Sequence, residues 1–534
     1  MRHLNKKLRL RAALVPVLGI LFVLGWMVYS FMHMSPFAAS WDEVDFVLAL
    51  DRFDLLAMQP HFPGYPYFVL GAMAVRQFGI DPVHAYAVLN ILLTASAVMP
   101  IWLLSRRILS PIWSLLAVLL ILTSPYLWLQ ALRPMSEAAG IAVLWWFLWS
   151  WWRAMEHRTW ASAWIVLFLF GLLMGVRLSF VPFGLSLVWL AAILMKQWRS
   201  QGKRPVPRAV VFIALAGFFQ LLWVAGLALS EGGFIGFVEL AAAFTEGHFD
   251  KWGGGVASAP DVSFAERALR FAGDNVLWTG MFARSAALLG AAAALLLAAV
   301  LSAGASRAPR LAASRGPRLA ARAAAWLSRP PLPGALAMLA GAYGAWALLA
   351  QNIDKPRHIT PLIGVMWLLL LALFRAAPPQ PPLAAPNPRA LRSRRALQTA
   401  GAILAAGIIT LQAAQGGLLA AQQASQRPAV YQLAGALQSA PAPGSTVLYT
   451  WEETRVLEYL HTPIPSRRIE TYNYFIADIQ ANPDATILLT DHVLKGFEAQ
   501  VGPLQAKVRE VAHYRSQSLF DPVYHDITVY EWIR

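Results

Sequence analysis

Carboxylates gather in one short stretch near the start of the chain. Asp42, Glu43 and Asp45 lie in the segment 40–68, which continues into the turn His61-Phe62-Pro63-Gly64-Tyr65-Pro66. On a helix, Asp42 and Asp45 are three residues apart and share one face. Two carboxylates on one face suit a divalent cation such as Mg²⁺ or Mn²⁺, or a general base with a neighbour that tunes it. The alternative is a solvated loop in which Asp42 caps the following helix.

Basic side chains recur in three later turns. The candidate residues in these turns are five basic side chains and one carboxylate, Glu137. The basic ones are Arg133, Arg177, Lys355, Arg357 and His358. A charge held at membrane depth costs a few kcal/mol, so such a residue is a candidate for function. Arginine and lysine suit phosphate binding, and a carboxylate suits the removal of a proton from an acceptor hydroxyl. The alternatives are that Arg177 snorkels to the headgroups and that the group at 355–358 contacts lipid headgroups.

The elements that position these residues are expected to cross a membrane. Of the 534 residues, 58% are hydrophobic and only 13% are charged. Apolar runs recur near the ~20 residues that cross a bilayer, which predicts an α-helical polytopic membrane protein with about eleven transmembrane helices. The runs fall at 12–32, 83–104, 111–128, 137–152, 160–175, 178–195, 209–229, 279–303, 333–350, 359–374 and 398–420.

Positive charge is distributed between the runs as the positive-inside rule expects. With the N-terminus in the cytoplasm, the loops assigned inside are rich in Arg and Lys, as at Arg106-Arg107 and around Arg389–Arg395. The long outside loops are then 33–82 and 230–278, and the candidate residues lie on the outer face of the cytoplasmic (inner) membrane. This topology accounts for the net charge of +16 without a nucleic-acid partner.

Residues 1–421 are predicted to form the membrane domain, and residues 422–534 a small extracytoplasmic α/β domain. In the second, strands near 445–450, 485–490, 507–515 and 527–533 accompany helices. Within the first, the Pro- and Arg-rich segment 376–397 is predicted to be a cytoplasmic linker. The segment 304–329 is predicted to be a cytoplasmic loop with a helix on the membrane surface.

Several classes of site are excluded or disfavoured. The chain has no cysteine, so it has no disulfide, thiolate metal site or cysteine nucleophile. The C-terminal domain has no glycine-rich phosphate loop, and no internal repeat indicates an inverted-repeat transporter. Glu246, His248 and Asp250 alternate as in a metal site, but their Gly-rich surroundings favour a mobile loop that shapes a substrate pocket.

With these residues in view, the sequence resembles the C-fold membrane glycosyltransferases, which include protein O-mannosyltransferases and enzymes of the lipid A aminoarabinose transferase type. The resemblance rests on Trp41-Asp42-Glu43, on the turn 61–66, and on the segments GVRLSFVP and DKPRHITPL. It covers roughly residues 1–375. The spacing after the acidic pair departs from that of the protein O-mannosyltransferases, so the resemblance does not extend to protein mannosylation.

The resemblance implies a hexosyl or pentosyl transferase that moves a sugar from a polyprenyl-phosphate donor to a lipid, glycan or protein acceptor. It implies that Asp42 is the catalytic base or a metal ligand, with Asp45 as the alternative from spacing. The other expected site residues are Glu43 as a catalytic residue and, as substrate-binding residues, His61, Tyr65, Arg133, Glu137, Arg177, Lys355, Arg357 and His358. Of these, Arg177, Lys355 and Arg357 are expected to hold the lipid phosphate. Such donors carry no nucleotide, so the diphosphate of a nucleotide sugar does not call for a metal here. A divalent metal, Mg²⁺ or Mn²⁺, stays open as a cofactor, with Asp42 and Asp45 as its ligands.

Two other classes of protein stay open. A transporter or flippase of lipid-linked sugars needs charged residues in the middle of its spans, and the apolar runs are largely free of charge. A non-catalytic cell-envelope assembly protein would work through its C-terminal domain and would tolerate Asp42→Asn. Charge at the ends of the spans favours chemistry at the membrane surface, and therefore a glycosyltransferase.

Overall fold

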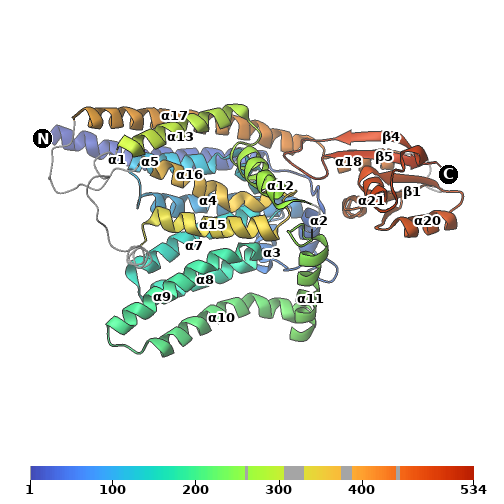
Figure 1. Cartoon of the computed structure of the whole chain (residues 1–534), viewed down its shortest axis with the longest axis horizontal. Helices are drawn as coiled ribbons and strands as arrows, with labels where there is room; N and C mark the ends of the chain where they lie inside the picture. The colour runs from blue at the N-terminus through green and yellow to red at the C-terminus, as the bar shows by residue number, and fades with distance from the viewer. Residues whose placement is uncertain (1, 259–261, 306–329, 375–387, 440–445, 534) are drawn as a thin grey trace.

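In a computed structural model, the chain is described over residues 2–258, 262–305, 330–374, 388–439 and 446–533. Long helices lie side by side along the long axis of the molecule, and a smaller domain with a β-sheet covers one end of this bundle (Figure 1). The N-terminus lies at the opposite end of the bundle, and the C-terminus lies in the small domain.

Every predicted apolar run overlaps a helix of the bundle. These helices are α1 (Arg2–Met32), α4 (Pro82–Ser105), α5 (Pro111–Leu122), α6 (Pro125–Ala131), α7 (Glu137–His157), α8 (Trp160–Val176), α9 (Leu185–Ser200), α10 (Pro205–Ser230), α13 (Ala286–Ala305), α15 (Leu332–Ala350), α16 (Thr360–Ala372) and α17 (Pro388–Ser425). Among the described residues, six helices are long and apolar enough to cross a membrane, and the bent pair α5–α6 makes a seventh. The count of eleven spans therefore stays a prediction.

Two of the predicted runs are interrupted. The run 111–128 forms two helices, α5 and α6, which meet at an angle of 59°. Pro125 has no N–H to donate and disfavours a helical conformation at Ser124, so the helix breaks there. The run 279–303 becomes an α-helix only from Ala286, because Arg270–Met281 form the π-helix η3.

The segment between α10 and α13 is helical where the sequence predicted a Gly-rich loop. It contains α11 (Phe234–Gly247), which crosses the end of the bundle (Figure 1), the π-helix η2 (His248–Trp252) and α12 (Phe264–Leu269). The buried Arg267 donates to the carbonyl oxygens of Leu348, Gly254 and Gln351. These bonds join the segment to the end of α15, so it is packed against the bundle.

The C-terminal domain is built on a five-stranded sheet in the order β2-β1-β3-β5-β4. The strands are β1 (Thr446–Thr450), β2 (Ser466–Arg468), β3 (Thr486–Thr490), β4 (Val508–Arg515) and β5 (Asp526–Trp532). Strands β2, β1 and β3 are parallel, and β5 is antiparallel to β3 and β4. The sequence placed four of these strands and missed β2, which has only three residues. The extracytoplasmic location of the domain stays a prediction.

Helices pack against both faces of this sheet. Side chains alternate between the two faces of a strand, so Leu448 packs with α18 (Ala429–Ser439) and α19 (Glu453–Tyr459). Val447 and Tyr449 pack with α20 (Tyr472–Ala481) and α21 (Asp491–Val501). Of the predicted linker 376–397, residues 376–387 lie outside the described residues, as do residues 306–329 of the predicted surface loop. The linker prediction is wrong from Pro388 onward, where α17 begins.

Helix α2 (Trp41–Ala49) lies between the bundle and the C-terminal domain (Figure 1). Its start follows from the sequence Ser40-Trp41-Asp42-Glu43, because the Glu43 carboxylate turns back to accept from the backbone N–H groups of Ala39 and Ser40. Val44 and Val47 belong to the same hydrophobic core as Val430 and Leu457 of the C-terminal domain. The helix that carries the predicted catalytic carboxylates is therefore held from both sides.

Gly171→Ala is expected to destabilise the bundle where α8 meets α10. A Cβ atom at this position would lie 2.8 Å from the Phe219 carbonyl oxygen and 2.9 Å from the Phe219 Cβ. Gly217→Ala in α10 is the matched control, because a Cβ there meets nothing within 4 Å. Replacing glycine by alanine inside a helix otherwise stabilises it by about 0.5–1 kcal/mol. Thermal unfolding in detergent should give a lower melting temperature for the first variant only, and equal values for both would contradict close packing of α8 and α10.

Candidate active site

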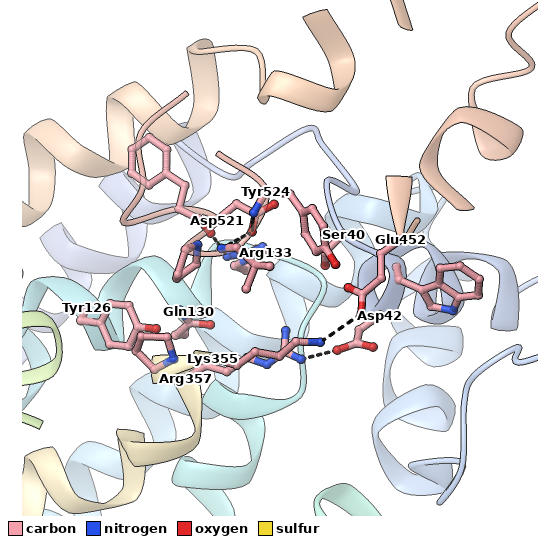
Figure 2. Close-up of a pocket in the computed structure, with 15 residues that line it drawn as sticks. Ser40, Asp42, Tyr126, Gln130, Arg133, Lys355, Arg357, Glu452, Asp521 and Tyr524 are labelled. Atoms are coloured by element: carbon pink, nitrogen blue, oxygen red, sulfur yellow. Dashed lines mark hydrogen bonds and ion pairs between the residues drawn. The ribbon is translucent and has the colours of Figure 1, made fainter. Parts of the chain in front are cut away.

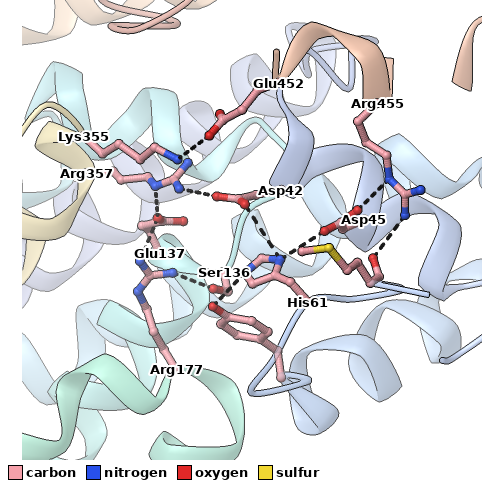
Figure 3. Close-up of polar contacts among 12 residues, drawn as sticks. Asp42, Asp45, His61, Ser136, Glu137, Arg177, Lys355, Arg357, Glu452 and Arg455 are labelled. Atoms are coloured by element: carbon pink, nitrogen blue, oxygen red, sulfur yellow. Dashed lines mark hydrogen bonds and ion pairs between the residues drawn. The ribbon is translucent and has the colours of Figure 1, made fainter. Parts of the chain in front are cut away.

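Asp42 and Asp45 lie on the same face of α2, and the His61 imidazole stands between their carboxylates (Figure 3). Nδ1 of His61 is 3.8 Å from Oδ1 of Asp42 and 3.4 Å from Oδ2 of Asp45. Nε2 of His61 shares a hydrogen bond of 3.1 Å with the Tyr65 hydroxyl. The turn 61–66, predicted to frame a site, thus brings an imidazole and a phenol against the two carboxylates.

Two arginines from distant turns meet at one buried carboxylate, Glu137 (Figure 3). Oε1 of Glu137 lies 2.9 Å from Nη2 of Arg177 and 3.3 Å from Nε of Arg357. Arg357 also donates to Oδ2 of Asp42, and Arg177 donates to the Ser136 hydroxyl at 2.7 Å. Glu137 therefore positions both guanidinium groups, and Arg357 links it to Asp42.

Breaks in the helices bring these cations into place. Between α8 and the 3₁₀ helix η1 (Leu178–Gly184), Arg177 has extended backbone angles, φ −158° and ψ 98°, so its side chain leaves the helical direction. Lys355 precedes the short 3₁₀ helix η4 (Pro356–Ile359), which carries Arg357 and His358 at the start of α16. Pro356 is the first residue of η4, and Pro182 lies inside η1; a proline has no N–H to donate, which limits how a helix can continue.

The two carboxylates of α2 have opposite ionisation tendencies. Burial alone would raise the pKa of Asp42, but the charges of Arg357, His61 and Lys355 outweigh it and hold the pKa well below its usual range. Burial raises the pKa of Asp45, and the lowering effect of His61 and Arg455 does not offset it. Asp42 is therefore ionised at neutral pH, whereas Asp45 holds a proton more readily.

A cavity of about 450 Å³ opens beside these groups. Seven of the predicted site residues line it: Asp42, His61, Tyr65, Arg177, Lys355, Arg357 and His358. The remaining wall is rich in aromatic side chains, among them Phe62, Phe249 and Trp346. A cavity that is cationic on one side and aromatic elsewhere suits a ligand with an anionic head and an apolar chain.

A second pocket, of about 40 Å³, also reaches Asp42 (Figure 2). It shares Asp42, Lys355 and Arg357 with the large cavity. Its other walls come from α6 and the turn after it, from the turn between β1 and α19, and from the loop between β4 and β5. They include Tyr126, Gln130, Arg133, Glu452, Asp521 and Tyr524. Gln130 is 2% exposed, and its Oε1 has no hydrogen-bond partner among the described residues. The Asp42 carboxylate thus lies where two cavities meet.

Glu43 and Arg133 pair with each other at the start of α2. Arg133 donates to the Glu43 carboxylate and to the Phe520 carbonyl oxygen. Of the two cavities that share Asp42, it lines the small pocket and not the large cavity. Glu43 is buried, lines neither the large cavity nor the small pocket, and accepts from the backbone at the start of α2. The geometry therefore favours a structural part for Glu43 in place of the predicted catalytic one.

The donors present do not fit a metal ion. In the described ranges, no group of three or more His, Asp or Glu side chains is arranged to hold one. Asp42 and Asp45 are paired instead with Arg357 and Arg455, and His61 stands between them. In the segment 246–250, His248 lines the cavity and contacts the Ala350 carbonyl oxygen, while Glu246 and Asp250 are exposed.

Two site residues of the C-terminal domain were not predicted from the sequence. Nε of Arg455 lies 2.9 Å from Oδ1 of Asp45, and Oε1 of Glu452 lies 3.8 Å from Nζ of Lys355. Both residues follow the carboxyl end of β1, where binding sites of α/β sheets commonly gather. Their position directly after a buried strand was the available signal in the sequence, where the segment is otherwise recognisable only as a helix.

The model of the dolichyl-phosphate-mannose-protein mannosyltransferase family matches residues 59–223. The chain resembles the C-fold membrane glycosyltransferases. The matched region contains the turn 61–66, Glu137 and Arg177, whereas Asp42 and the group at 355–358 lie outside it. No curated protein matches the chain in sequence.

Three solved structures align with most of this chain at low identity. ArnT from Cupriavidus metallidurans bound to undecaprenyl phosphate is 14% identical, with 96% of this chain and 97% of that chain covered and a TM-score of 0.49. The oligosaccharyltransferase of Archaeoglobus fulgidus in the apo form is 13% identical, with 89% of this chain and 69% of that chain covered and a TM-score of 0.45. The arabinofuranosyltransferase AftD from Mycobacteria is 15% identical, with 97% of this chain and 40% of that chain covered and a TM-score of 0.45. Because these TM-scores lie below 0.5, the resemblance rests on the family match and the motifs.

Glu137→Ala is expected to lower the free energy of unfolding by about 3–5 kcal/mol, because it leaves the buried Arg177 without its carboxylate. Glu156→Ala is the control. It removes the 3.0 Å contact with Arg107, in which both side chains are about a third or more exposed, and such pairs contribute about 0–1 kcal/mol. Thermal unfolding in detergent measures both variants. Equal melting temperatures would show that Arg177 finds another partner.

Proposed function

We propose that the protein transfers a sugar from a polyprenyl-phosphate donor to a hydroxyl group of a lipid, glycan or protein acceptor, on the outer face of the cytoplasmic membrane. The observation that carries the proposal is the place of Asp42. Its carboxylate lines both the large cavity and the small pocket, and it pairs with Arg357. The match to a mannosyltransferase family model supports the same reaction class.

The large cavity is proposed as the donor site. Arg177, Lys355 and Arg357 line it together and offer charge-assisted hydrogen bonds to a phosphate. The aromatic side chains of Phe62, Phe249 and Trp346 offer an apolar surface to a prenyl chain. One ligand with both parts is a lipid-linked phosphosugar, whose phosphate then lies next to Asp42.

The chemical step follows from this placement. The ionised Asp42 takes the proton of the acceptor hydroxyl, and the hydroxyl oxygen forms a bond to the anomeric carbon of the sugar. The bond from that carbon to the phosphate oxygen breaks, and its electron pair stays with the phosphate. The arginines and Lys355 stabilise the charge that grows on the leaving phosphate. Attack opposite the leaving group inverts the anomeric configuration.

The small pocket is proposed as the approach of the acceptor. It shares Asp42 with the large cavity, and residues of the C-terminal domain, among them Glu452 and Tyr524, form part of its wall. Its walls offer both hydrogen-bond donors and acceptors, including the carboxamide of Gln130 and the hydroxyl groups of Tyr126 and Tyr524. Such groups suit a hydroxyl-bearing substrate, whatever molecule carries it.

Asp42→Asn is expected to lower the rate of sugar transfer by roughly 10²–10⁴-fold, the usual contribution of a general base. Asp51→Asn is the matched control, because Asp51 lies in the same loop but is exposed and pairs with Arg76. The measurement is transfer of radiolabelled sugar from a panel of undecaprenyl-phosphate sugars to membrane lipid, glycan and protein fractions. Equal rates in both variants would remove Asp42 as the base. Absence of transfer by folded wild-type protein with every donor would contradict the transferase and favour transport.

The absence of native cysteine allows a direct test of orientation. Tyr474→Cys, in α20 of the C-terminal domain, is 76% exposed and should react with a membrane-impermeant maleimide in intact spheroplasts. Ser200→Cys, at the exposed end of α9, should react only after permeabilisation. The reverse pattern of labelling would place the domain and the site in the cytoplasm.

A further inference from the structure

The C-terminal domain makes direct contact with the helix that carries Asp42 and Asp45. Val44 and Val47 of α2 are buried in one core with Val430 and Leu457. On the polar side of α2, Arg455 from α19 reaches over the same helix, and Figure 3 shows its side chain directed at Asp45. The domain therefore contacts α2 through both apolar packing and an ion pair.

The Arg455 guanidinium joins two segments of the candidate site. Its Nε donates to Oδ1 of Asp45 at 2.9 Å. Its Nη2 donates to the carbonyl oxygens of Ala57 at 3.1 Å and Met58 at 3.3 Å. These carbonyls belong to the segment that leads into His61, so one side chain fixes the distance between α2 and the turn 61–66.

The contacts continue from Arg455 to the proposed base. Asp45 is fully buried, and its second oxygen faces Nδ1 of His61 at 3.4 Å. The same nitrogen lies 3.8 Å from Asp42. A buried carboxylate needs a partner for its charge, and Arg455 supplies it on the side away from His61.

We propose that Arg455 is a positioning residue for the transfer reaction. Through Asp45 it orients the His61 imidazole, and through His61 it fixes the Asp42 carboxylate between the two cavities. The C-terminal domain is then a working part of the site, because the reaction geometry depends on a side chain from it. This inference rests on the proposed function, since Asp42 is taken as the base.

Arg468 offers a close control. Both arginines lie over the Trp41 ring, at 5.7 Å for Arg455 and 5.3 Å for Arg468, and both belong to the C-terminal domain. Arg468 pairs with Glu470 and lies over Trp451, but no ion pair joins it to Asp45 among the described contacts. Arg468→Gln therefore removes a stacked guanidinium at the same domain interface and leaves Asp45 paired.

The first experiment measures kcat and the donor KM in proteoliposomes, with the undecaprenyl-phosphate sugar that wild type uses. Arg455→Gln should lower kcat by roughly ten- to a hundredfold, as expected for a displaced catalytic group, and leave the donor KM within about twofold. Arg455→Lys should restore part of the rate, and Arg468→Gln should keep it. Loss of rate in both glutamine variants alike would reduce Arg455 to a domain contact and overturn the proposal.

A double-variant cycle tests the route through Asp45. If Arg455 acts through Asp45, then Asp45→Asn combined with Arg455→Gln should be no slower than Asp45→Asn alone. Multiplying losses would overturn the route.

A second readout needs no activity: the rate at which diethylpyrocarbonate modifies His61, followed by mass spectrometry. It should rise in Arg455→Gln and stay unchanged in Arg468→Gln. That result in protein without transfer activity would contradict the proposed function and leave the positioning of His61 by Arg455 intact. An unchanged rate in both variants would overturn the positioning itself.

Discussion

The site depends on buried charges that neutralise one another. Glu137 holds Arg177 and Arg357 together, Arg357 pairs with Asp42, and Asp45 pairs with Arg455. Removing these groups from water is unfavourable, and only mutual pairing makes their burial tolerable. The backbone breaks at Arg177 and before Arg357 serve this end, because each directs a cation toward a carboxylate of another segment. The unfavourable burial of this charge cluster is thus offset by ion pairs among its own members.

The pairing also gives the cluster its chemical asymmetry. Asp42 faces several cations and stays ionised, while the more deeply buried Asp45 faces fewer and holds a proton more readily. Two aspartates three residues apart therefore differ through their surroundings alone. One is suited to accept a proton, and the other is suited to orient the imidazole between them.

The sequence predicted the helices and much of the site for a physical reason. The positive-inside rule assigns each loop to one side of the membrane from its Arg and Lys content alone. The sequence therefore predicts Asp42, His61, Arg177 and Arg357 on the same side. Their distances were beyond such reasoning, because they depend on how the helices pack. Arg455 was missed for the same reason, since it pairs with Asp45, which lies 410 residues away in the sequence. The segment after α10 was predicted to be a loop because it is rich in glycine, whereas the structure has α11, η2 and α12 there.

The length of helix α17 bears on the height of the candidate site relative to the lipid surface. It has 38 residues, which at about 1.5 Å per residue span roughly 57 Å, nearly twice the ~30 Å of a bilayer's hydrocarbon core. About 25 Å of rigid rod therefore remains for the water and headgroup layers, and its carboxyl end leads directly into the C-terminal domain. The domain and α2 are thereby held at a fixed height relative to the lipid surface. In the proposed reaction, this height would select acceptors by reach as well as by shape, because the acceptor hydroxyl has to come to the level of Asp42.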